Sequence, residues 1–94
     1  MRKLLLMAIL SAVLSASDYK CMHYAKRTTV NMTKMISFQQ EGMMRESKEY
    51  AKKYRDNYIH AKAECSPSTR PDIKSLLAGM TKGYNIAKKN GWLK

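Results

Sequence analysis

The sequence predicts an all-α protein, in which a disulfide-stapled antiparallel helical hairpin is followed by a third amphipathic helix and preceded by a signal peptide. Apolar residues recur at intervals of three and four positions along most of the chain, which is the spacing of one helix face. Cys21 and Cys65 lie on either side of Gly42, which interrupts that spacing. Because a helix rises about 1.5 Å per residue, the two sulfurs of one chain can join only if it turns back near Gly42.

Residues 1–17 have the features of a secretory signal peptide. Two basic residues precede the apolar run Leu4–Leu14, and small residues follow it. The run has eleven residues, which is too short to cross a bilayer comfortably. We expect cleavage near Ala16 or Ser17, which leaves one small helical domain at 18–94 in the periplasm or secreted.

The expected mature domain is small and strongly basic. The chain has 18 basic and seven acidic residues, and two of the basic ones belong to the signal peptide, so the mature formal charge is +9. Domains of this size often need a covalent crosslink in addition to their core. Both cysteines lie in the exported part, where an oxidising compartment favours one disulfide between Cys21 and Cys65.

The first helix is expected over about 19–40, where small and apolar residues keep one stripe. That stripe comprises Cys21, Ala25, Thr28, Met32, Met35 or Ile36, and Gln39. A strand stays open as an alternative, because Thr28, Val30 and Met32 also alternate and several neighbours are weak helix formers. Gly42 then favours a tight connection to the next helix.

The second helix is expected over about 43–64. Charged residues of alternating sign stand four apart, which predicts a ladder of favourable ion pairs on the exposed face: Glu41, Arg45, Glu49 and Lys53. The opposite face carries Met43, Ser47, Tyr50, Ala51, Tyr54, Tyr58, Ala61 and Cys65. Ser66 and Pro67 end this helix.

Folding the chain about Gly42 opposes small residues near the cysteines, and methionine and tyrosine further along. The expected pairs are Cys21 with Cys65, Ala25 with Ala61, Thr28 with Tyr58, Met32 with Tyr54, and Ile36 with Tyr50. The competing arrangement is one long helix from about Asp18 to Glu64, with cysteines pairing between two chains. We favour the hairpin and a monomer over that disulfide-linked dimer, because Gly42 has no role in an unbroken helix.

The third helix is expected over about 70–90. Thr69 or Ser68 stands near its cap, with a proline at an early position. Its amphipathic stripe comprises Ile73, Leu76, Leu77, Met80, Tyr84 and Ala87. Gly79 and Gly83 predict a close approach to the hairpin, and Asn90-Gly91 predicts the helix end. Trp92 follows, where it either covers the hairpin or stays exposed as an anchor.

The chain shows no set of residues arranged for catalysis, so we do not expect an enzyme or catalytic residues. We also expect no cofactor and no metal ion. The one zinc-like set, Cys21, His23, His60 and Cys65, has spacings that point its members apart on helices. Six mature methionines suit a cuprous site, but we prefer them as adaptable core filler. The tyrosines at 50, 54 and 58 likewise read as an inner face with solvated lysines outside, so nucleic acid is not an expected partner.

The third helix and tail form the most one-sided cationic part of the chain, since 66–94 hold six basic residues and one acid. We assign partner binding to this surface: Arg70, Lys74, Lys82, Lys88, Lys89 and Trp92. Such a surface favours an anionic partner. We expect an acidic protein of the cell envelope, with anionic lipid or a cell-wall polymer as the alternatives.

The layout resembles that of small periplasmic two-cysteine helical proteins such as the HdeA-type acid-stress chaperones. The features that carry the resemblance are the signal peptide, Cys21 near the mature start, Cys65-Ser66-Pro67 and the closing amphipathic helix. The resemblance is one of architecture alone, since those chaperones are richer in acidic residues. A similar layout occurs among phage-encoded or immunity proteins that block lysozymes or toxins in the periplasm.

From these observations we expect an exported binding protein that acts by stoichiometric contact, as an inhibitor, immunity or exclusion factor. The alternative is a membrane- or envelope-binding cationic protein, in which Trp92, Leu93 and Lys94 and the third helix bind anionic lipid. A periplasmic chaperone and a copper carrier rank behind these two.

Overall fold

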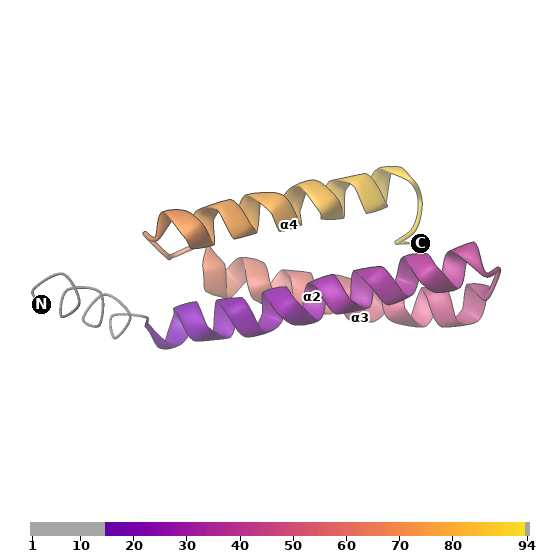
Figure 1. The fold of residues 1–94 in the computed structure, drawn as a ribbon, viewed down its shortest axis with the longest axis horizontal. Coiled ribbons are helices and arrows are strands. Elements are labelled where there is room, and N and C mark those ends of the chain that lie inside the picture. The colour runs from indigo at the N-terminus through magenta and orange to yellow at the C-terminus, as the bar shows by residue number, and fades with distance from the viewer. Residues whose placement is uncertain (1–14, 94) are drawn as a thin grey trace, which may run out of the picture.

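The computed structural model describes residues 15–93 and is all-helical over that range, as the sequence predicts. It contains α2 (Ala16–Gln40), α3 (Met44–Cys65) and α4 (Pro71–Lys89). Helices α2 and α3 lie side by side in antiparallel directions, and α4 runs along the pair (Figure 1). After α4 the chain turns back toward the α2–α3 pair. Residues 1–14, which make up most of the expected signal peptide, lie outside the described residues.

Helix α2 begins at Ala16, three residues before the expected start, because Ser15 caps it. The Ser15 hydroxyl accepts a hydrogen bond from the Asp18 backbone N–H at 3.0 Å, and the Asp18 carboxylate accepts one from the Ser15 N–H. This reciprocal capping box satisfies donors that a helix start leaves free. The expected cleavage near Ala16 or Ser17 would therefore remove the capping residue of α2.

Helices α2 and α4 both end in a left-handed glycine. Gly42 has φ of 76° and Gly91 has φ of 74°. After each, the next residue donates a backbone hydrogen bond back into the helix, from Met43 to the Phe38 carbonyl at 2.8 Å and from Trp92 to the Ala87 carbonyl at 3.0 Å. This is the Schellman motif, which explains why Gly42 allows the chain to reverse.

Two glycine-to-alanine substitutions should change stability in opposite directions. Gly42→Ala should destabilise by about 1 kcal/mol, because alanine resists a positive φ. Gly79→Ala should stabilise by up to about 1 kcal/mol, because it adds helix propensity where a Cβ would meet no atom within 4 Å. Urea unfolding of the two variants measures both changes, and a loss of stability in Gly79→Ala would contradict the structure of α4.

The buried side chains form two clusters along the bundle axis. The first cluster lies at the disulfide end and comprises Cys21, Ala25, Tyr58, Ala61, Cys65, Ile73 and Met80. The second cluster comprises Met35, Ala51, Tyr54 and Ala87, with Trp92 and Leu93 half-buried against it. The Ser47 hydroxyl ties α3 to α2 by donating to the Met35 carbonyl at 3.2 Å. Each cluster takes residues from all three helices, so α4 completes both.

The predicted ladder of ion pairs on the second helix is wrong. Glu41 belongs to the turn as the C-cap of α2, and the Lys53 ammonium lies over the Tyr50 ring at 4.6 Å. Exposed pairs gain little free energy against the entropy of ordering two long side chains, so other contacts compete easily. Among residues 15–93 the ion pair that forms joins Arg70 to Asp72 at 3.0 Å.

The cap of the third helix also differs from the expected Thr69 or Ser68. Arg70 is the N-cap residue, because Pro71 occupies the first helical position, where its fixed φ suits the helix. The Ser68 hydroxyl instead accepts a hydrogen bond from the Arg70 N–H at 3.2 Å, and so orders the loop before the cap.

Candidate functional site

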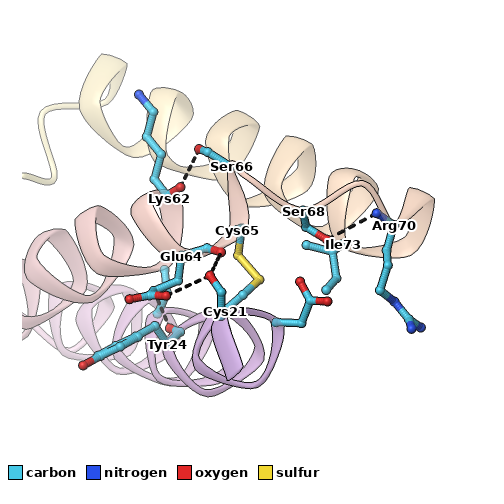
Figure 2. The surroundings of a disulfide bond; sticks show 12 residues. Cys21, Tyr24, Lys62, Glu64, Cys65, Ser66, Ser68, Arg70 and Ile73 are labelled. Atoms are coloured by element: carbon cyan, nitrogen blue, oxygen red, sulfur yellow. Dashed lines mark hydrogen bonds between the residues drawn. A yellow bond between two sulfur atoms is a disulfide. The ribbon is translucent and has the colours of Figure 1, made fainter. Parts of the chain in front are cut away.

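The disulfide between Cys21 and Cys65 joins the start of α2 to the end of α3, as predicted. Their Cα atoms are 4.8 Å apart and both side chains are buried. Figure 2 shows Ile73 of α4 close to this bridge, and the three residues belong to the first cluster. Beside the bridge, the Ser17 hydroxyl contacts the Glu64 carbonyl oxygen at 2.9 Å. The bridge therefore fixes the end of the bundle from which α4 departs.

The zinc-like set, which its spacing in the sequence argued against, has no free thiolate, because both of its sulfurs are in the disulfide. His60 stacks on Tyr24 at 4.9 Å between ring centroids, and His23 meets the same ring edge-on at 5.3 Å. Tyr24 thus takes part in both histidine contacts. Within the described part of the chain, no three His, Cys, Asp or Glu side chains gather where they could share a metal ion.

Four of the residues assigned to partner binding share one face of α4. Lys74, Lys82, Lys88 and Lys89 are all exposed, and they fall within an arc of about 120° at 3.6 residues per turn. We call these four residues the lysine face. Asp72 is the one acid in the α4 sequence and lies on the other side of the helix. The field above the lysine face is consequently positive along the length of α4.

The other two assigned residues, Arg70 and Trp92, are engaged elsewhere. Arg70 donates to Asp72 from Nε at 3.2 Å and from Nη2 at 3.0 Å. This hydrogen bonding, together with the opposite charge, lowers the pKa of the Asp72 carboxyl and raises the pKa of Arg70. Trp92 is half-buried against the second cluster, so its indole covers the hairpin.

A shallow depression lies between the end of α3 and α4, beside the lysine face. It is lined by Ser66, Lys74, Ala78, Thr81, Lys82 and Asn85, among others. Two ammonium groups and several neutral polar groups therefore border one concave surface. Carboxylates and other anions are the groups that such a surface would receive.

Two of the three tyrosines at 50, 54 and 58 lie inward. Tyr54 and Tyr58 are buried, and Tyr50 is half-buried beneath two lysine ammonium groups. Tyr58 stacks on Tyr84 of α4 at 4.1 Å between centroids. These rings hold α3 to α4, so they are not arranged as an open stacking platform for nucleic-acid bases.

Burial raises the pKa of Tyr54 from 10.0 to about 12, and nearby Tyr84 and Tyr58 add to the effect. Between pH 10 and about 12 the folded protein retains a proton that the unfolded chain loses. This contribution to stability is therefore complete below about pH 10 and is lost as the pH rises through about 12. Urea unfolding across this range should show a smaller alkaline loss in Tyr54→Phe than in wild type. Tyr19→Phe, at an exposed site, should behave as wild type.

The sequence did not predict a groove that lies on the side of α4 away from the lysine face. The glycines at 79 and 83 were expected to bring α4 close to the hairpin. A Cβ at Gly83 would lie 3.7 Å from Met32 Sδ, so that expectation holds there, but a Cβ at Gly79 would meet no atom within 4 Å. Space is left between α2 and α4 at this position. The only signal in the sequence was the absence of a side chain at Gly79.

Comparisons with protein-family models, with curated proteins and with solved structures found no match to this chain. Among residues 15–93, no helix has an apolar stretch of the length and hydropathy that crossing a membrane requires.

Proposed function

We propose that this chain is an exported binding protein that acts by stoichiometric contact with an acidic protein of the cell envelope. Its lysine face would bind the partner, and the binding would inhibit or exclude that partner or confer immunity to it. The signal-peptide features of residues 1–17 support the export, and the disulfide suits an oxidising compartment. The main observation behind the proposal is the lysine face, which places four exposed cations on one helix with no acid among them.

Rigidity of the scaffold supports contact by a preformed surface. Helix α4 is tied to the hairpin by Ile73 at the first cluster and by Ala87 at the second. The Tyr58 hydroxyl, which lies 3.1 Å from Thr81 Oγ1, adds a hydrogen bond between them. Lysines on a helix held at both ends lose less freedom on binding than lysines on a flexible tail, which favours affinity.

The test compares two variants of equal charge. In the first, Lys74, Lys82, Lys88 and Lys89 become glutamine. In the second, four exposed lysines outside α4, at 20, 26, 48 and 52, become glutamine. Each variant is crosslinked to proteins of the periplasmic extract. We expect the wild type and the second variant to capture the same protein at one-to-one stoichiometry, and the first variant to lose it.

Equal capture by both variants would show that net charge, rather than the lysine face, determines binding. Recovery of no defined protein by the wild type would contradict the proposal. Raising the salt concentration should weaken capture by the wild type, because exposed charges are screened over about 8 Å at physiological ionic strength.

The second candidate is an envelope-binding protein that uses the same lysines on anionic lipid or a cell-wall polymer. Its support is the excess of basic residues, 18 against seven acids. Binding of the wild type to anionic vesicles that the α4 variant loses would favour it. The half-buried position of Trp92 makes this residue a poor anchor in such a surface. A chaperone and a copper carrier stay behind these two proposals.

A further inference from the structure

The groove between α2 and α4 lies away from the lysine face and has a volume of about 320 Å³. All three helices contribute to its lining, which includes Thr28, Met32, Tyr54, Leu76, Gly79 and Gly83. Leu76 is exposed and Met32 is half-buried, so apolar surface is open to an occupant here. No charged residue is among those that line it.

The shape of the groove follows from its two glycines. At Gly79 the backbone of α4 has only open space beside it, which makes the hollow. At Gly83 a Cβ would lie 3.7 Å from Met32 Sδ and 4.0 Å from the Tyr54 hydroxyl oxygen. The Tyr54 hydroxyl therefore lies close to the α4 backbone at the glycine-lined side of the groove.

Tyr54 is 1% exposed, yet among residues 15–93 no group accepts a hydrogen bond from its hydroxyl. Every fully buried side-chain nitrogen or oxygen in the same range has a partner. The remaining exposure of Tyr54 is consequently at its hydroxyl, which faces the groove that this residue lines. Tyr58, one helical turn on, differs because its hydroxyl lies 3.1 Å from Thr81 Oγ1.

The other buried hydroxyl of the groove is already committed as a donor. Thr28 donates to the Tyr24 carbonyl at 2.7 Å, and its exposed neighbour Thr29 donates to the Ala25 carbonyl at 3.1 Å. The groove thus offers one deep hydrogen-bond donor, from Tyr54, while Ser75 and Thr29, the other hydroxyl-bearing residues of its lining, are exposed. An ionised ligand group placed there would lose its hydration without a charge to compensate it. A neutral acceptor is the group that satisfies Tyr54 at little cost.

We propose that this groove binds a small neutral apolar molecule with one carbonyl oxygen, which accepts a hydrogen bond from the Tyr54 hydroxyl. The hydrocarbon part packs against Met32, Leu76 and Met80. The occupant is a small molecule because a volume of 320 Å³ is at the lower end of small-molecule pockets. A stable protein partner needs about 1,000 Å² or more of buried surface, which this hollow does not supply. The lysine face has no part in this site, so the two proposals stand independently.

The experiment compares acetophenone with ethylbenzene, which has nearly the same shape but lacks the carbonyl. Each is titrated into the full-length, oxidised protein while the methyl signals of Met32, Leu76 and Met80 are followed by NMR. We expect saturable binding of both, tighter for acetophenone by about 2- to 12-fold, the value of one neutral hydrogen bond. Tyr54→Phe should abolish that preference.

Gly79→Leu should block both ligands by filling the hollow, whereas Ala78→Leu should bind as wild type, because Ala78 is exposed beside the lysine face, about 100° around α4 from Gly79. If Gly79→Leu fails to fold, the binding site is located by the residues whose methyl signals shift in the wild type. Chemical-shift changes confined to the methyl groups of Met32, Leu76 and Met80 support the proposal. No binding by the wild type, shifts elsewhere, or an equal preference for acetophenone in Tyr54→Phe would overturn it.

Discussion

Replacing Cys21 and Cys65 together with alanine is expected to lower the free energy of unfolding by about 4 kcal/mol. The bridge joins residues 44 apart in the sequence, and in the chain-entropy model a loop of that length stabilises by this amount, through the unfolded chain. Small domains have roughly 5–15 kcal/mol in total, so the expected loss is a large share of the stability. Urea unfolding of the oxidised wild type and the double variant measures the difference.

Two measurements serve as controls for this comparison. They are the helix content at low temperature and the slope of the unfolding free energy against urea concentration. The double variant should still show native-like helix content without urea, because the second cluster is untouched and the first keeps Ala25, Tyr58, Ala61, Ile73 and Met80. A loss below about 1 kcal/mol would contradict the chain-entropy account and would show that packing alone fixes the hairpin. The result bears on the proposed export, because a domain that depends on its disulfide is suited to an oxidising compartment.

The sequence predicted the hairpin well because two independent constraints agree on it. Gly42 adopts the left-handed conformation that favours glycine, and the cysteines on either side of it are joined. These features are local or covalent, so they do not depend on how distant surfaces pack. Residues 28–32 form part of a helix, as we favoured, and not the alternative strand. Thr28 and Thr29 donate hydrogen bonds to backbone carbonyl groups within α2.

The errors concern features that depend on competition between surface contacts or on packing between helices. The ladder on α3 failed because Lys53 lies over Tyr50 instead of beside Glu49. The groove at Gly79 was missed because helix spacing does not show how closely α4 approaches α2 at each turn. The free hydroxyl of Tyr54 follows from the same packing, so no pattern in the sequence indicated it.

Met35→Ala is expected to lower the free energy of unfolding by about 2–5 kcal/mol, as other large-to-small core substitutions do. Met35 is 0% exposed and belongs to the second cluster with Tyr54 and Ala87. Its truncation would leave a cavity at the place where α2 meets both other helices. Met35→Leu should cost less than about 1.5 kcal/mol, because it nearly conserves the side-chain volume.

Met44→Ala is the matched control, since this methionine is 53% exposed at the start of α3 and its loss should change stability by no more than about 0.5 kcal/mol. Met32 gives the sharper contrast, because the sequence had opposed it to Tyr54. It is half-buried at the edge of the groove, so Met32→Ala should cost less than Met35→Ala. The reverse order would mean that α2 is rotated about its axis, and that Met32 rather than Met35 fills the space between α2, α3 and α4.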